Sequence, residues 1–235
     1  MSLSFCIPGG RIQAVQCDVA AGMRSASGAG PLPDLLEIVA MEKSILRRLK
    51  FLPRLFRMED AEKLVPHPAM FLSRALKNGL IHRLMRGHYI NSFLYGFPRV
   101  ETVGCFLRPP AYISGEWALN YHGVSLQSPV VCTIITLSSA VGKCRNIQYK
   151  GVTIEFSKIS PVLFSGFMRV DDFYIATPEK AVLDTLHLRK SLPVEDELEL
   201  DNIDIEIMNK MAQKFPLSVT RRLDPLLFFQ TGILY

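Results

Sequence analysis

The sequence has 235 residues, 49% of them hydrophobic, which is enough to bury the core of one large domain or of two small ones. No apolar run approaches the roughly 18 residues of a membrane span, and the first residues lack the basic and apolar segments of a secretion signal, so we expect a cytoplasmic protein. The net charge of +5 is unevenly distributed, because residues 42–100 hold 12 Lys and Arg against 4 Asp and Glu. This local excess favours a polyanionic partner, although a basic surface that serves solubility alone would give the same count.

Residues 1–33 are rich in Gly, Ala and Ser and show no sustained period, which predicts a disordered leader. The five cysteines form no CxxC pair and no Cys/His set with zinc spacing. We expect reduced thiols that act as small hydrophobic side chains, with no metal site and no cofactor.

Residues 34–98 predict three helices followed by a hairpin. Apolar positions recur at helical spacing from residue 35 to residue 49, and Pro53 ends that first helix. A second, short helix is expected over 58–65, with acidic residues in its first turn. In the third helix Pro68 suits the first helical position, and Gly79 suits the left-handed position after the end.

The stretch that follows Gly79 alternates in polarity, turns at Gly87 and returns, which predicts a β-hairpin with a basic tip. A helix, a short helix, a third helix and then a basic hairpin is the order of a winged helix-turn-helix, whose third helix enters the major groove of DNA. We therefore expect an α+β fold, with a winged helix-turn-helix domain over 34–98 and a larger mixed helix and sheet domain over 99–235.

The third helix is expected to turn Phe71, Leu72, Ala75 and Leu76 inward and to present its opposite face to DNA. Arg74 is the best candidate for a bidentate contact with guanine, and the cations of the hairpin would neutralise phosphates. The predicted DNA-binding residues are His67, Met70, Ser73, Arg74, Lys77, Arg83, Arg86 and His88.

The second half predicts both strands and helices. A connector that contains a strand is expected over 100–113, then a helix capped by Ser114 and closed by Gly123. Strands follow within 130–137, 147–159 and 167–176, and a helix begins after the N-cap Thr177. The acidic block over 195–206 reads either as a solvated helix face or as a contact for a basic partner, and further helices close the chain.

The sequence carries no P-loop, GxGxxG, HExxH or GxSxG motif, so we expect no enzyme. Asp171 and Asp172 with Glu179 and Lys180 approach a metal-dependent nuclease pattern, but their spacing fits a turn followed by the first turn of a capped helix. His122 sits at the end of a predicted helix, where contacts with backbone carbonyls are commoner than a role as catalytic base.

Four segments in this order resemble the AbiEi abortive-infection antitoxins of type IV toxin–antitoxin systems. They are LKNGLIHRLMRGHYI, AYISGEWALNYHGV, VTIEFSKI and IATPEKAVLDTL, and the resemblance covers most of residues 42–190. It implies a winged-helix domain that represses its own operon by binding promoter repeats, with a recognition helix over 68–78 and a wing over 80–90. It also implies a second domain associated with antitoxicity against a nucleotidyltransferase toxin, and it assigns no catalytic residue.

Two other functions stay open. One is a free-standing transcription factor whose second domain senses a ligand, and the other is a nuclease guided by a DNA-binding domain. Double-stranded DNA is the partner common to all three, and none of them requires a membrane. Whether the second domain touches the toxin directly, or counteracts it by another route, is left open by the sequence.

Overall fold

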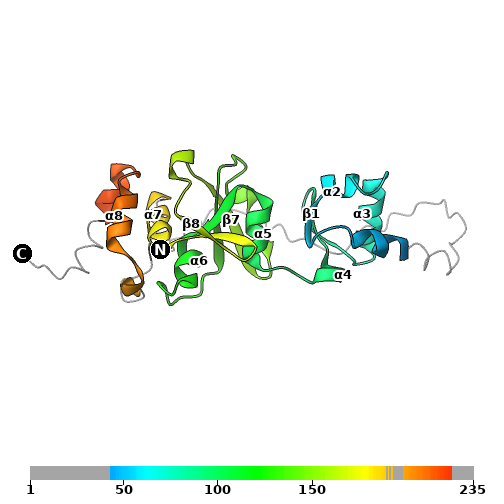
Figure 1. Ribbon diagram of the computed structural model, residues 1–235, viewed down its shortest axis with the longest axis horizontal. Helices are drawn as coiled ribbons and strands as arrows, with labels where there is room; N and C mark the ends of the chain where they lie inside the picture. The colour runs from blue at the N-terminus through cyan, green and yellow to red at the C-terminus, as the bar shows by residue number, and fades with distance from the viewer. Residues whose placement is uncertain (1–42, 189, 191, 193–197, 224–235) are drawn as a thin grey trace, which may run out of the picture. The chain divides into compact units, whose positions relative to one another are not determined.

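The computed structural model describes residues 43–188, 190, 192 and 198–223 (Figure 1). The predicted leader, the start of the first predicted helix and the first part of the acidic block lie outside the described residues. All described residues fall in one compact unit, which is mixed α and β and contains two separate sheets. The domain boundary predicted after residue 98 stays a prediction.

The first sheet has three short antiparallel strands in the order β1-β3-β2. The part of the chain that contains this sheet has the following elements in order: the helical residues 43–49, β1 (Leu55–Arg57), α2 (Met58–Glu62), α3 (Pro68–Lys77), β2 (His82–Met85), β3 (His88–Ile90) and α4 (Ser92–Tyr95). Apolar side chains from these elements are buried: Ile45, Leu49, Phe56, Ala61, Phe71, Leu72, Ala75, Ile81 and Ile90. Their burial holds the short helices and strands together, because none of them is long enough to be stable alone.

Two details of this part differ from the prediction. The strand β1 was not predicted, and α2 ends at Glu62 rather than at residue 65. β1 has three residues, too few for a readable alternation, and it exists because it pairs with β3. The third helix begins at Pro68 as predicted, and Gly79 follows its end with a left-handed φ of 68°.

The side chain of Asn91 closes the end of the first helix. It is fully buried, and its Nδ2 donates to the carbonyl oxygens of Leu49 at 2.9 Å and Leu52 at 3.3 Å. Leu49 is the last helical residue, and its carbonyl oxygen also accepts from the backbone N–H of Leu52 at 3.1 Å, while the Leu52 carbonyl lies in the segment that follows. Asn91 therefore fixes the segment after β3 against the segment after the helix.

The second sheet has six strands in the order β6-β7-β5-β4-β9-β8, with parallel pairs at β5/β7 and β4/β9. Its strands are β4 (Ala111–Ser114), β5 (Val131–Thr136), β6 (Ile147–Tyr149), β7 (Val152–Lys158), β8 (Phe167–Val170) and β9 (Phe173–Ala176). The helices of this part are α5 (Val100–Leu107), α6 (Gly115–Tyr121), α7 (Pro178–His187) and α8 (Ile205–Ala212), and residues 217–223 are also helical. Short 3-10 helices lie at Lys143–Arg145, Pro161–Leu163 and Leu200–Asn202.

Residues 100–107, predicted as part of a connector, instead form α5. Its central Gly104 explains why the helix was missed, because glycine is a poor helix former. The same residue lets α5 approach the sheet closely, since an added Cβ would lie 2.9 Å from Cγ1 of Ile134. Packing against β5 and β7, through Ile134 and Ile154, outweighs the weak local preference.

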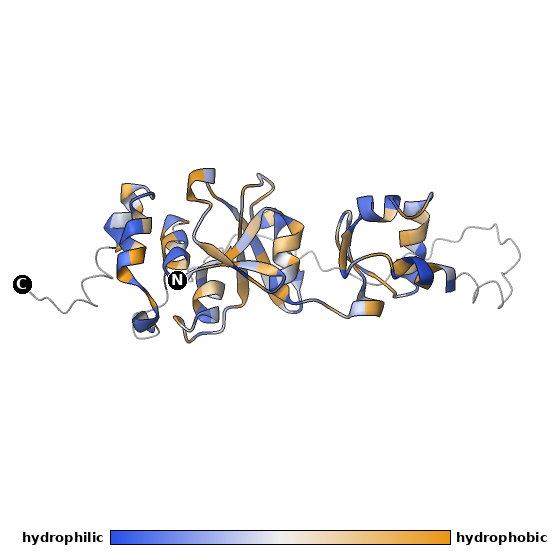
Figure 2. Ribbon diagram, in the orientation of Figure 1, coloured by the Kyte–Doolittle hydropathy of each residue, from blue (hydrophilic) through white to orange (hydrophobic). Residues whose placement is uncertain are grey.

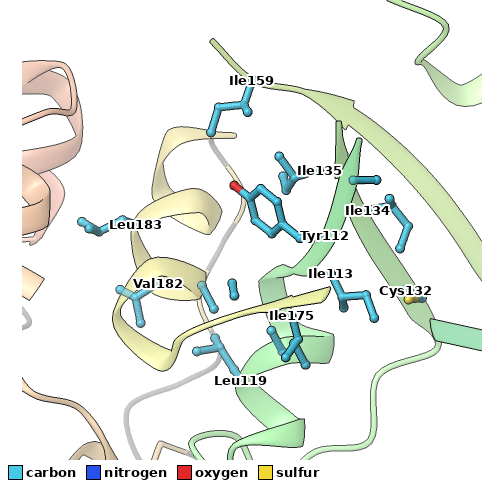
Figure 3. Close-up of a cluster of buried hydrophobic side chains, with 14 of the residues drawn as sticks. Tyr112, Ile113, Leu119, Cys132, Ile134, Ile135, Ile159, Ile175, Val182 and Leu183 are labelled. Atoms are coloured by element: carbon cyan, nitrogen blue, oxygen red, sulfur yellow. The ribbon is translucent and has the colours of Figure 1, made fainter. Parts of the chain in front are cut away.

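The larger sheet is covered on both faces. Ile134 faces α5, whereas Tyr112 and Ser114 of β4 reach Asp184 of α7 on the other side. Successive strand residues point to opposite faces, so β4 serves both layers. Figure 3 shows the side chains of α7 and the central strands meeting, with Tyr112 directed toward α7.

The predicted turns are present, but the predicted side-chain cap of Ser114 on α6 is not: Ser114 occupies the N-cap position without a cap hydrogen bond, and its hydroxyl donates to Asp184. Lys150 and Gly151 join β6 to β7 with positive φ angles of 51° and 79°, and Asp171 begins the turn between β8 and β9. Thr177 caps α7, because its side chain accepts from the backbone N–H of Lys180. Within the part of the chain that the structure describes, no helix combines the length and apolarity needed to cross a membrane.

Candidate nucleic-acid interface

The outer face of α3 carries most of the predicted DNA-binding residues. Phe71, Leu72 and Ala75 are buried, so the opposite side of the helix is left to the solvent. The exposed set on that side consists of Met70, Ser73, Arg74 and Lys77, with the exposed His67 just before the helix. Spacings of three and four residues place these side chains along one face, the arrangement that a recognition helix requires.

The two cations of this face, Arg74 and Lys77, can bind an anion, because neither forms an ion pair with a described carboxylate. Among residues 43–98 the ion pair that the structure gives joins Lys63 to Asp60 at 3.5 Å, and neither Arg74 nor Lys77 takes part in one. Both cations lie in the last turn of α3, where they also complement the negative end of the helix dipole. Helix stability alone would account for their position, but not for the absence of carboxylate partners among the described residues.

The hairpin places two more cations in solvent. Arg83 of β2 and Arg86 of the turn are both exposed, and Gly87 completes that turn with a φ of 79°. The register shifts between Arg83 and Met85, and Nε of Arg83 donates to the carbonyl oxygen of Met85 at 3.4 Å. The backbone N–H of Met58 donates to the carbonyl oxygen of Gly87 at 2.9 Å, which ties the tip to the start of α2.

His88 is placed differently from the other predicted residues. Its ring meets the ring of Phe106 edge-on at a centroid distance of 5.6 Å, and its Nδ1 lies 3.1 Å from the carbonyl oxygen of Arg86. Burial lowers the pKa of His88, and the positive charge of Arg57 lowers it further, against an opposing effect of the hydrogen bond to Arg86. His88 is therefore neutral at physiological pH and adds no charge to the hairpin.

The sequence argument named no cation of the first helix. Lys43, Arg47, Arg48 and Lys50 are nevertheless exposed on it or just after it. Figure 2 shows hydrophilic and hydrophobic residues alternating along this helix. The signal was the excess of charge over residues 42–100, which marked a basic surface without indicating which helix carries it.

The carboxylates that resembled a nuclease pattern do not come together. Asp171 lies 3.9 Å from Arg99, Asp172 accepts from the hydroxyl of Thr102 at 2.9 Å, and Glu179 accepts from a backbone N–H. No group of three His, Cys, Asp or Glu side chains in the described residues could hold a metal ion. The pattern is a turn followed by the capped first turn of α7.

His122 likewise makes a structural contact with a backbone carbonyl. It follows the end of α6, and its Nε2 lies 2.8 Å from the carbonyl oxygen of Ala176 at the end of β9. This contact joins α6 to the strand that precedes α7. The contact is with a backbone carbonyl, but that carbonyl belongs to β9 and not to the end of α6, where the prediction placed it.

The sequence matches no protein-family model, and no curated protein matches it significantly. Among solved structures, the chain is similar to the crystal structure of the RV2827C protein from Mycobacterium tuberculosis, with a TM-score of 0.57 and 11% sequence identity. The similarity covers 80% of this chain and 76% of that chain. This share is larger than residues 99–235 alone, so the similarity is not confined to that part of the chain.

Proposed function

We propose that this protein is a DNA-binding transcriptional autorepressor and an antitoxin that counteracts a nucleotidyltransferase toxin. In this proposal the winged helix-turn-helix comprises residues 34–98, with α3 as recognition helix and β2–β3 as wing. The order of helix, β1, α2, α3 and hairpin, with the sheet order β1-β3-β2, supports it.

The observation that carries the DNA-binding part is the row of exposed, unpaired polar side chains on α3. Arg74 has the planar fork of donors that matches O6 and N7 of guanine, and Ser73 and Met70 flank it for weaker or apolar base contacts. Lys77, Arg83 and the other cations would contact phosphates, which gives affinity that falls with salt and carries no sequence information.

The antitoxin part rests on the resemblance of the second half to AbiEi antitoxins. Its two most specific segments form the neighbouring units β4–α6 and β9–α7, in which β4 and β9 pair in parallel. Many of their residues are buried, including Tyr112, Ser114, Lys180 and Asp184. We infer that these segments build the scaffold of the second domain, and that antitoxicity depends on its exposed surface.

Duplex binding tests the first part. The complete protein is titrated against a fluorescent duplex from its own promoter and against a random duplex of equal length, at several salt concentrations. Arg74→Ala should lose about 1–3 kcal/mol on the promoter and little on random DNA. Arg86→Ala should weaken both duplexes alike and lower the salt slope by about one. Arg145→Ala, at an exposed cation beyond the first sheet, is the matched control.

Equal losses on both duplexes for Arg74→Ala would show that Arg74 has no role in base recognition.

Antitoxicity is tested by co-expression with the nucleotidyltransferase encoded beside this gene, scoring growth with the complete protein and with residues 99–235 alone. Rescue by the complete protein supports the proposal, and rescue by residues 99–235 alone separates antitoxicity from repression. A toxin that neither form counteracts would overturn the antitoxin assignment.

A second candidate, a transcription factor that senses a small ligand, is favoured by one cavity. It has a volume of about 720 Å³, inside the range of about 300–1,000 Å³ that is usual for ligand sites. Phe106, Phe164, Phe167 and Tyr174 supply aromatic walls, and Asp172 supplies a carboxylate. An aromatic amine that raises the melting temperature and also shifts promoter affinity would favour this function over the first.

A further inference from the structure

The second domain contains a buried ion pair that the DNA-binding proposal does not use. Lys180 and Asp184 lie one turn apart on α7, with side chains 1% and 0% exposed, and Nζ of Lys180 bonds to Oδ1 of Asp184. The other carboxylate oxygen accepts from the hydroxyls of Tyr112 and Ser114, each at 2.9 Å. Both oxygens of Asp184 are thus occupied by β4 and α7 together.

The ammonium of Lys180 is less completely satisfied. It lies 5.5 Å from the centroid of the Tyr112 ring and 4.9 Å from that of Phe215. An ammonium has three N–H donors, and in the described part of the chain Asp184 is the one acceptor that bonds to it. The ring faces attract the cation, but they do not replace an oxygen acceptor. The group therefore keeps the capacity to bind one more acceptor.

A cavity of about 240 Å³ adjoins this lysine. Lys180 and Lys214 line it together with Ser165, Phe215 and Met211, and no carboxylate belongs to the described lining. Lys214 is exposed and follows the end of α8, so it brings a second positive charge to the mouth of the cavity. The hydroxyl of Ser165 adds a neutral donor.

Gly166 keeps the cavity open. Its φ is 78°, and a Cβ at this position would lie 3.2 Å from Cγ of Lys180 and would collide with the terminal methyl of Met211. A side chain here would therefore need both a strained backbone and the displacement of a neighbour. The space beside the lysine stem thus depends on glycine.

We propose that this cavity binds a small oxyanion of the phosphate class, held by Lys180, Lys214 and Ser165. Asp184 balances the charge of Lys180, so Lys214 supplies the net positive charge of the site. The two ammonium groups and the hydroxyl supply N–H and O–H donors for the oxygens of a phosphate group. The volume admits that group. The anion is either free phosphate or the terminal phosphate of a nucleotide. The site is separate from the α3 surface and does not depend on its function.

The test titrates the complete protein with inorganic phosphate at constant ionic strength, balanced with chloride, and measures binding by phosphorus NMR line width and by melting temperature. Wild-type protein should bind saturably. Lys214→Met should weaken binding at least about tenfold, which corresponds to about 1.4 kcal/mol. Lys210→Met removes an exposed charge of α8 outside the cavity lining and should change nothing.

Arg74→Ala controls for phosphate that binds the basic α3 surface, and it should leave the saturable binding intact. Gly166→Ala should weaken binding, because its methyl group would displace the side chains of Met211 and Lys180 that line the cavity. If that variant does not fold, Lys214→Met still decides. Non-saturable binding, or equal effects of Lys214→Met and Lys210→Met, would overturn the proposal. A parallel titration with adenosine monophosphate distinguishes the sources, because tighter binding than phosphate identifies a nucleotide and weaker binding identifies the free anion.

Discussion

Replacing Lys180 by methionine removes one charge from a buried pair and leaves the other without a partner. Asp184 is fully buried, so its carboxylate would have no water to compensate the loss. Breaking a buried ion pair in this way costs about 3–5 kcal/mol. Because Tyr112 and Ser114 still donate to Asp184, we expect the lower end, about 3 kcal/mol of unfolding free energy.

The assay is urea unfolding at pH 7, followed by circular dichroism and tryptophan fluorescence. Lys63→Met is the matched control, because its ion pair with Asp60 is exposed at 74% and 37%, and such pairs contribute under about 1 kcal/mol. The double variant Lys180→Met with Asp184→Asn should recover most of the stability, since it leaves no buried charge. A loss below about 1 kcal/mol for Lys180→Met alone would refute the buried-charge reasoning.

The pH dependence gives this reasoning a second check. Burial raises the pKa of Asp184, and loss of Lys180 raises it further because the attraction that favoured the carboxylate is gone. A raised folded-state pKa means that protonation favours the folded form. The deficit of Lys180→Met relative to wild type should therefore be full above that pKa and should shrink as the pH falls through it. A deficit that grows on acidification would contradict the assignment.

Three further predictions concern stability and reactivity. Asn91→Ala should cost about 1–3 kcal/mol in urea unfolding, because it removes the side-chain donor to the Leu52 carbonyl and one of the two donors to the Leu49 carbonyl; no loss would show that water replaces the amide. Gly104→Val should lower the melting temperature strongly, since its side chain would overlap Ile134, whereas an unchanged value would mean that α5 can move away. Burial raises the pKa of Cys105 to about 11, so iodoacetamide at pH 8 should label the exposed Cys144 well before it, and the reverse order would contradict the burial.

Elements with local signals could be predicted from the sequence. Pro68 and Gly79 mark the two ends of α3, and Thr177 marks the start of α7, because caps act within a few residues. The strands within 130–137 and 147–159 followed from their β-branched residues and from the turn at 150–151.

Elements that depend on distant partners could not be predicted. β1 exists through pairing with β3, and α5 through packing of Gly104 against Ile134. The sheet order β6-β7-β5-β4-β9-β8 is likewise set by pairings between strands far apart in the chain.

The residues of the candidate sites also divide into those that local spacing could place and those that only distant partners could place. The outer face of α3 followed from helical spacing alone, whereas the orientation of His88 toward Phe106 needed the structure. Lys180 was placed in the first turn of a capped helix, and the structure shows that its side chain lies in the core. The spacing of Lys180 and Asp184, one turn apart on a helix with an apolar face, was the signal that could have identified the buried pair.

The pairing at the centre of the larger sheet also bears on synthesis of the protein. Ile113 of β4 lies opposite Ile175 of β9, so one side of a central strand stays unpaired until the ribosome has made nearly the whole sheet. An uncovered strand edge is a template for pairing with other chains. Nascent chains that stall or are cleaved before residue 176 would thus expose β4 and be prone to aggregate, and cells would need to clear or shield them.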